Sequence, residues 1–265
     1  MATYRASDGC ELHYEFDRVD RDLTVVFLNG MTQSTSHWNR QAKAFAEHYS
    51  VLRYDARGQG DSQLGDAELT LEQHASDLAG IFDECDIDSA HLVGFSHGAR
   101  IALEFARDYP SRIDKLVLCS ATAEPTALAR TIVRAWKGVL DSGAGLEGLA
   151  WASLPTILGN DFLEKNEGIL DGVVKATVQR NSEDGVRALL EAMIDYPDLD
   201  GLAEDISCPT RVISADEDLL VTAEGAERLA ELVDGDWIEL EGVGHTIPIE
   251  APEAFRETVL AFLDA

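Results

Sequence analysis

Short runs of apolar residues alternate along the chain with longer segments in which apolar residues return every three or four positions. An uninterrupted apolar run is typical of a strand buried on both faces of a sheet, and the recurring pattern predicts an amphipathic helix. The runs predict strands at 24–28, 51–55, 91–95, 115–119, 210–214 and 237–240. The recurring segments predict helices at about 36–48, 71–83, 97–109, 223–233 and 252–263. This alternation favours an α/β fold whose mostly parallel sheet is covered by helices on both faces.

Two parts of the chain depart from the alternation. Near the start, residues 3–5 and 11–16 alternate apolar and polar positions around Asp8-Gly9, which predicts a first hairpin. From 124 to 205 the pattern is helical throughout and holds no convincing strand. We interpret 124–205 as an inserted helical cap, and 1–123 together with 206–265 as the core of the fold.

The stretch 91–100 carries the strongest chemical signal. It predicts a strand, a sharp corner at Ser96 and a helix that begins at His97, and Gly94 and Gly98 give the corner the form Gly-x-Ser-x-Gly. Such a corner strains the serine backbone and exposes its hydroxyl in front of free N–H groups at the helix start. We expect Ser96 to be a nucleophile and the backbone N–H of His97 to stabilise an oxyanion. A serine that only caps the helix is the alternative.

A nucleophilic serine needs a base beside it, usually a histidine that a carboxylate orients. His245 lies on a glycine-rich loop after the last predicted strand, at the end of a parallel sheet where catalytic groups gather. We therefore expect His245 to be the base. His37 is close enough to the loop after 24–28 to line a pocket, whereas the remaining four are expected on strand or helix surfaces: His13, His48, His74 and His91.

The loop after the strand at 210–214 offers three carboxylates, Asp216, Glu217 and Asp218. It lies between Ser96 and His245 in the chain, and the order serine, acid, histidine accompanies this kind of serine corner. We expect the acid that orients His245 to come from this loop.

These motifs resemble the α/β-hydrolase superfamily, in particular its smaller capped, carboxylesterase-like serine hydrolases, over nearly the whole chain except the cap. The resemblance implies the α/β-hydrolase fold. It also selects Asp218 as the orienting acid, because the family often carries it as the fourth residue of a Gly-x-x-Asp loop. Ala215 replaces that glycine here, so Asp216 is the reserve, and members with the acid after the preceding strand would point to Glu124.

The resemblance also implies a second oxyanion donor, the backbone N–H of Met31. The family usually has a His-Gly pair before this residue, and the chain has Asn29-Gly30. The segment 55–62 matches another family motif. We interpret it as a structural turn in which Asp55 and Arg57 form loop hydrogen bonds, rather than as a phosphate site.

The charge is strongly one-sided, with 49 acidic against 21 basic residues, a net charge of −28 and few lysines. Such a surface repels nucleic acid and anionic membranes, so we expect neither as a partner. Acid excess with few lysines also resembles proteins of salt-loving organisms. The hypothesis is that stability rises with salt, because salt screens the repulsion between like charges.

The start of the sequence lacks the basic and apolar regions of a signal peptide, and no apolar stretch approaches the roughly 20 residues of a membrane span. The four cysteines are scattered without a Cys-x-x-Cys pair, which favours thiols in a reducing compartment over disulfides or a metal site: Cys10, Cys85, Cys119 and Cys208. We expect a cytoplasmic protein without metal or cofactor.

The expected activity is hydrolysis of a small-molecule carboxylic ester through an acyl-enzyme intermediate on Ser96. Lactones, thioesters and C–C bonds beside a carbonyl remain open as substrates. A ligand-binding receptor with the same fold, an acyltransferase and a cofactor-free oxygenase remain open as other functions. Three large residues of the cap are candidates either for pocket walls or for packing against the core: Trp136, Trp151 and Phe162.

Overall fold

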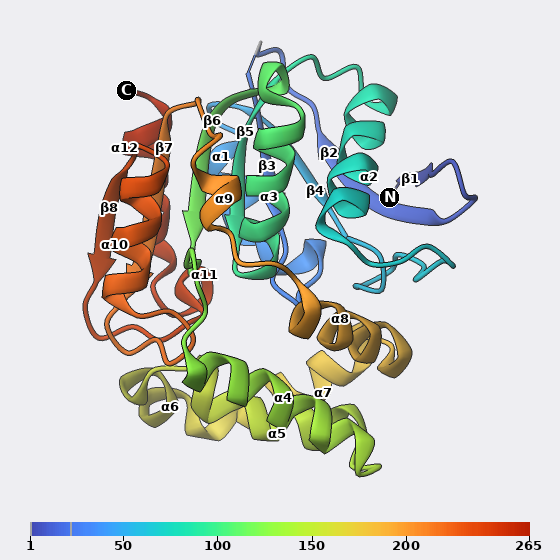
Figure 1. The fold of residues 1–265 in the computed structure, drawn as a ribbon, viewed down its shortest axis with the longest axis vertical. Coiled ribbons are helices and arrows are strands. Elements are labelled where there is room, and N and C mark those ends of the chain that lie inside the picture. Colours follow the sequence, from blue (N-terminus) through green and yellow to red (C-terminus); the bar gives the residue numbers. More distant parts are fainter. Residues whose placement is uncertain (1, 22) are drawn as a thin grey trace.

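The chain folds around one sheet of eight strands in the computed structural model, which describes residues 2–21 and 23–265. The strands are β1 (Ala2–Arg5), β2 (Glu11–Asp17), β3 (Thr24–Leu28), β4 (Ser50–Tyr54), β5 (Ala90–Phe95), β6 (Ile113–Cys119), β7 (Thr210–Ala215) and β8 (Asp236–Leu240). Their order is β1-β2-β4-β3-β5-β6-β7-β8 (Figure 1). β2 runs antiparallel to β1 and β4, and every other pair is parallel. The predicted hairpin and mostly parallel sheet are confirmed.

The strand order reverses at β3, which pairs with β4 on one side and with β5 on the other. Every residue of these three strands is buried, which the uninterrupted apolar run of β3 predicts. In an open parallel sheet, ligands bind beyond the carboxyl ends of the strands where the order reverses. The loops after β3 and β5 are therefore the first places to look for a site.

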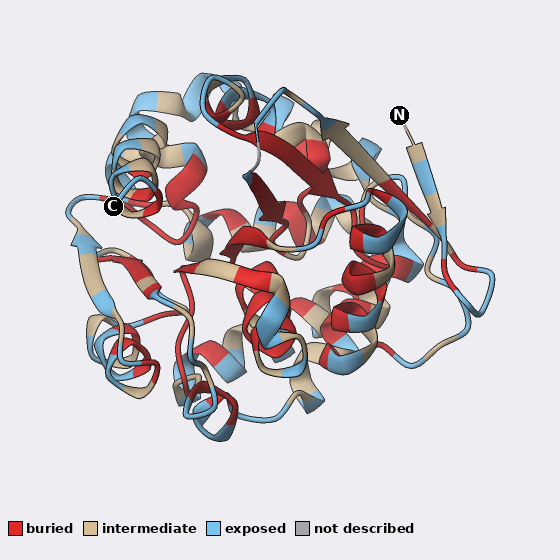
Figure 2. Ribbon diagram, turned by 90° about the horizontal axis from the view of Figure 1, so that it is seen from above, coloured by how far each residue is buried: buried red, intermediate tan, exposed pale blue. Residues whose placement is uncertain are grey.

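Helices cover both faces of the sheet and enclose a separate apolar core on each (Figure 2). α2 (Leu71–Glu84), α3 (His97–Asp108) and α10 (Ala223–Leu232) pack on one face, and α1 (Asn39–Phe45) and α12 (Pro252–Leu263) on the other. Alternate residues of one strand enter different cores, as Val25 and Val26 of β3 do. Each fully buried large apolar side chain contributes roughly 1.5–3 kcal/mol.

A group of helices is inserted between β6 and β7. It comprises α4 (Ala127–Asp141), α5 (Gly145–Ile157), α6 (Asn160–Asn166), α7 (Leu170–Arg180), α8 (Glu183–Asp195) and α9 (Asp200–Ala203). Figure 1 shows α4 to α8 gathered beyond the carboxyl ends of the strands, where Trp136, Leu149 and Val186 share a small core of their own. α9 differs, because Leu202 and Ala203 belong to the core beneath α3 and α10. The division of the chain into a core and a cap at 124 and 205 stays a prediction.

Two smaller findings bear on the sequence analysis. Among the described residues, no helix combines the length and apolar character of a membrane-spanning segment. The four cysteines are free thiols, of which Cys10, Cys85 and Cys119 are buried and Cys208 is partly exposed.

Candidate active site

Ser96 lies at the corner between β5 and α3 with φ +53° and ψ −112°, a conformation that strains a residue with a side chain by roughly 1–3 kcal/mol. Its N–H donates to the carbonyl of Cys119 at 2.8 Å, which ties the corner to β6. A Cβ on Gly94 would lie 2.6 Å from the Ala99 Cα, and one on Gly98 would lie 2.4 Å from the Leu28 carbonyl oxygen. Both glycines are therefore required by the close approach of α3 to the strands.

His245, on the loop between β8 and the short helix α11 (Ile247–Glu250), contacts Ser96 and Asp218 at the same time. Its Nε2 lies 2.9 Å from the Ser96 Oγ, and its Nδ1 lies 2.7 Å from the Asp218 Oδ2. Because a carboxylate can only accept, Nδ1 carries the proton and Nε2 is free to accept the serine proton. The Ser120 hydroxyl donates to the His245 carbonyl at 2.8 Å and so holds the loop in place.

Four carboxylates were candidates for the acid, and only Asp218 contacts His245, whereas Glu217 accepts from the Asn160 N–H at 2.7 Å. The second oxygen of Asp218 accepts from the N–H groups of Leu220 at 2.7 Å and Val221 at 3.0 Å, which fixes the carboxylate. Asp216 instead accepts from the N–H of Gly242 at 2.7 Å, in the turn after β8. Glu124 is exposed and lies 3.8 Å from Arg130. The backbone of the β7 loop thus aims one of its acids at the imidazole and another at the neighbouring turn.

The loop after β3 is held in place by side-chain amides. Gln59 donates to the carbonyls of Gly30 at 2.9 Å and Met31 at 3.1 Å, and the Gln33 side chain accepts from the Gly30 N–H at 3.2 Å. In the described part of the chain, the N–H groups of Met31 and His97 donate to no protein acceptor. Both residues line the same cavity as Ser96. Two backbone donors are therefore available beside the serine.

Asn29, which stands where the family resemblance implies a histidine, anchors this loop to its surroundings. Its amide donates to the Tyr54 carbonyl and to Asp55, both at 3.0 Å, and its oxygen accepts from the Trp38 indole at 2.8 Å. The replacement therefore provides three hydrogen bonds that fix the loop.

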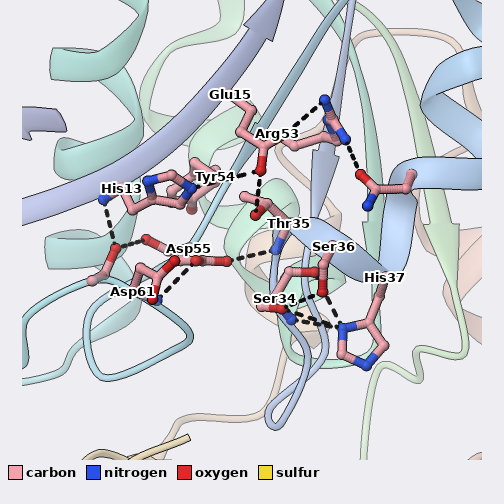
Figure 3. A network of polar contacts seen from close by, with 12 residues as sticks. His13, Glu15, Ser34, Thr35, Ser36, His37, Arg53, Tyr54, Asp55 and Asp61 are labelled. Atoms are coloured by element: carbon pink, nitrogen blue, oxygen red, sulfur yellow. Dashed lines mark hydrogen bonds and ion pairs between the residues drawn. The ribbon is translucent and has the colours of Figure 1, made fainter. Parts of the chain in front are cut away.

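Asp55 is the centre of a buried polar network beside this loop (Figure 3). Its carboxylate accepts from the Asn29 amide and from the backbone N–H groups of Thr35 at 2.7 Å and Asp61 at 3.0 Å. Burial raises the pKa of the Asp55 carboxyl, although these donors oppose the shift. Arg57 is also buried, in ion pairs with Asp8 and Asp77 at 2.6 Å each. Both residues form the loop contacts that the sequence predicts for a structural turn.

The same network brings together a group with metal-ligand chemistry, although the sequence showed no metal-ligand spacing. Ligand atoms of His13, Asp55 and Asp61 lie within 4.8 Å of one another (Figure 3). The Asp55 carboxylate is already occupied by three N–H donors, and the His13 Nε2 lies 3.7 Å from Glu15. The group is better described as part of a hydrogen-bond network than as a metal site, because a metal ligand needs free lone pairs.

Three histidines expected at the surface are buried, so that prediction is wrong for His13, His74 and His91 and holds for His48. His74 falls at helical spacing with Leu71, Ala75 and Leu78 on the apolar face of α2. This spacing could have predicted that His74 is buried.

His74 packs edge-on against the His97 ring at a centroid distance of 5.2 Å, and Tyr196 stacks on the His97 ring at 5.9 Å. Burial lowers the pKa of His74 to about 3 and that of His97 well below its usual range. Both rings are therefore neutral at neutral pH, and neither competes with His245 as a base.

A cavity of about 250 Å³ opens over Ser96 between the strand ends and the inserted helices. Trp136 and Phe162 line it, but Trp151 does not and is 41% exposed, so Trp151 is wrong as a candidate wall. His37 also lines the cavity, and burial lowers the pKa of its ring to about 4. The walls are mostly apolar, and Ser96 and His245 are among the residues that line the cavity.

A carboxylate joins the His245 loop to the inserted helices. Glu250 accepts from the N–H groups of Gly244 at 3.0 Å and Thr246 at 3.0 Å, on either side of His245. It also accepts from the N–H of Gly159, in the turn between α5 and α6, at 2.8 Å. Sequence reasoning missed this residue, because nothing in the local pattern of α11 shows where its carboxylate points.

Comparison with known proteins identifies the family of the chain. Residues 25–258 match the alpha/beta hydrolase family. A protein of Caulobacter sp. (strain K31), with the provisional name carbamate hydrolase RutD, is 28% identical over 244 residues, which is 91% of this chain and 90% of that protein.

Two solved structures are similar over nearly their whole length. The enol-lactonase from Burkholderia xenovorans LB400 has a TM-score of 0.89 and 29% identity, and the match covers 99% of this chain and 100% of that one. A thermophilic esterase from Thermogutta terrifontis, solved with malate bound, has a TM-score of 0.86 and 26% identity, with 99% and 97% covered. With the family match spanning most of the sequence and the fold shared throughout, the chain belongs to the alpha/beta hydrolase family.

Proposed function

We propose that the protein is a serine hydrolase that cleaves small carboxylic esters through an acyl-enzyme intermediate. The observation that carries the proposal is the continuous hydrogen-bonded chain from Asp218 through His245 to Ser96, which ends in an apolar cavity. This order of acid, base and nucleophile activates a hydroxyl that is otherwise a poor nucleophile at neutral pH.

The reaction proceeds in two steps. The Ser96 Oγ attacks the substrate carbonyl carbon while the His245 Nε2 takes its proton, and the Met31 and His97 N–H groups stabilise the negative oxygen. The C–O bond to the leaving alcohol breaks as His245 returns the proton to that oxygen. Water then attacks the acyl-serine with His245 again as base, releases the acid and restores the Ser96 hydroxyl.

Helices α4 to α8 of the segment 124–205 act as a cap over the serine. Their side chains, with Trp136 and Phe162 among them, close one side of the cavity and exclude bulk water from the acyl-enzyme. The proposed core and cap meet at the Glu250 carboxylate, next to the proposed base.

A lactone is the second candidate substrate class. The 29% identity to an enol-lactonase over the full chain favours it, and a lactone is a cyclic ester that the same two steps would open. Four free cysteines support the further proposal that the protein works in the reducing cytoplasm.

Hydrolysis of p-nitrophenyl esters from acetate to octanoate tests the proposal, with γ- and δ-lactones followed by acid release. We expect turnover of the short and medium esters, and a kcat at least about 10⁴-fold lower in Ser96→Ala. Ser142→Ala, which removes an exposed hydroxyl at the end of α4, is the matched control and should keep wild-type activity. Equal activity of Ser96→Ala and the wild type would refute the nucleophile.

A further inference from the structure

The cavity over Ser96 has the opposite charge to the rest of the protein. Three arginines line it, and no aspartate or glutamate does so among the described residues: Arg100, Arg130 and Arg134. Acidic residues outnumber basic ones by 49 to 21 in the chain, so a wall of average composition would be acidic. The positive charge of this wall favours an anionic ligand in the cavity.

Arg100 is the arginine of this wall nearest to Ser96 in the sequence, one helical turn further along α3. It is partly buried, burial lowers the pKa of its guanidinium, and its hydrogen bond to the Pro197 carbonyl is long, at 3.4 Å. The charge of Asp198 acts on it at longer range, but no carboxylate of the described chain lies within 4 Å of it, whereas buried Arg57 contacts both Asp8 and Asp77. A desolvated guanidinium without a directly bonded carboxylate is unfavourable, and an anion in the cavity would supply that contact.

Arg130 and Arg134 extend this positive charge along one side of the cavity. They are four residues apart on α4 and so share one face of the helix. Both are exposed, and Arg134 forms no ion pair within the described residues, while Arg130 donates to the Pro125 carbonyl and lies 3.8 Å from Glu124, which is not among the residues that line the cavity. An anion that approaches an enzyme of charge −28 would meet here a local field of the favourable sign.

We propose that this cavity selects esters or lactones whose acyl part carries a free carboxylate, and that Arg100 and Arg134 bind that carboxylate. The inference rests on the proposed function, and it names the substrate class. Guanidinium groups suit the task because their planar N–H pairs match the two oxygens of a carboxylate and stay charged. The apolar remainder of the wall accommodates the methylene chain between the carboxylate and the scissile carbonyl.

Two substrates of the same length test the proposal. Mono(4-nitrophenyl) adipate carries a free carboxylate, and methyl 4-nitrophenyl adipate has the same chain with that charge masked. The measured quantity is the ratio of their kcat/KM values, and we expect the wild type to favour the free acid. In Arg100→Gln and in Arg134→Gln this ratio should fall about tenfold or more, because a charge-assisted bidentate contact is lost.

Two further variants distinguish a loss of carboxylate binding from a folding defect and from a general change in net charge. Arg100→Lys keeps the charge at the partly buried position and should restore part of the ratio, which a purely structural loss would not allow. Arg228→Gln removes the same charge at an exposed position on α10 and should leave the ratio unchanged. A ratio near one in the wild type, or an equal fall in Arg228→Gln, would overturn the inference.

A binding measurement keeps this inference separate from the proposed hydrolysis. Calorimetry with adipate and with its neutral diamide, on the Ser96→Ala protein, reports carboxylate binding without turnover. Adipate should bind at least about tenfold more tightly than the diamide, and Arg134→Gln should remove the difference. If no ester is hydrolysed but adipate still binds, the proposed function fails and the anion site stands. If neutral esters are hydrolysed and adipate does not bind, the anion site fails alone.

Discussion

At the scale of single residues, two aspartates two positions apart have different tasks. Asp218 accepts from the His245 Nδ1, and Asp216 accepts from backbone N–H groups of the turn after β8. We predict that Asp218→Asn lowers kcat on esters by roughly 10³–10⁴, because the amide favours the wrong imidazole tautomer. Steady-state kinetics with p-nitrophenyl butyrate measure this, and Asp216→Asn should retain most of the activity. The opposite ranking would make Asp216 the orienting acid.

His74 should make the protein less stable in acid. Its folded pKa of about 3 lies below the usual value of 6.5, so between these values the unfolded chain binds a proton that the folded chain does not. The free energy of unfolding therefore falls as the pH falls from 6.5 towards 3. We predict that His74→Phe gains stability relative to the wild type over this range, by about 1 kcal/mol per pH unit.

Urea unfolding at pH 5 and at pH 8 checks this difference. His48→Phe, at an exposed position on the segment after α1, is the matched control and should follow the wild type at both values. A His74→Phe protein whose stability changes with pH as steeply as that of the wild type would show that this ring accepts a proton without unfolding.

At the scale of elements, the junction at Glu250 joins the His245 loop to the turn between α5 and α6. A Cβ on Gly244 would lie 2.3 Å from the Gly159 nitrogen, so the two backbones are in direct contact. We predict that Glu250→Gln lowers kcat about tenfold with a smaller change in KM. The amide leaves backbone N–H groups unpaired, which costs about 1–3 kcal/mol and loosens His245.

Glu253→Gln is the control for this junction, because Glu253 is exposed and pairs with Arg40 on the surface. It should leave both kinetic constants unchanged. If Glu250→Gln lowered only the melting temperature, the junction would be structural and would not position His245.

The helix predicted after β3 differs from its prediction, because contacts with distant segments determine where it begins. The helix expected at 36–48 is a 3₁₀ turn at Thr35–Trp38 followed by α1, which ends at Phe45. The Thr35 N–H donates to Asp55 and the Trp38 indole donates to Asn29. These contacts with other segments fix the entry of the helix, and its periodicity could not show them.

At the scale of the whole molecule, the net charge of −28 sets the response to salt. Many arginines are already in surface ion pairs, which contribute little each, so repulsion among the remaining acids dominates. We predict that the melting temperature rises between low and 2 M KCl, because screening weakens this repulsion. Calorimetry across a KCl series measures it, with equal osmolality of sucrose as the control for solvent effects. A falling melting temperature would contradict the hypothesis.

The sequence by itself determined the features that depend on neighbours along the chain. The continuous apolar run at 24–28 marks a strand that is buried on both faces, and β3, β5 and β7 appear where the mainly apolar segments predict strands. The corner at Ser96 is likewise local, because its two glycines are required by the immediate turn from strand to helix. Periodicity and turn chemistry act within a few residues, so they can be recognised without the fold.

Only the tertiary structure decided which groups meet across long separations in the chain. It showed that Asp218 rather than Asp216 contacts His245, and that Ser120 and Glu250 hold the loop of that histidine. It also collected arginines from α3 and α4 in one cavity without an acid among its described lining residues. These outcomes depend on where each backbone aims a side chain once the sheet and the inserted helices have packed, and no local pattern carries that information.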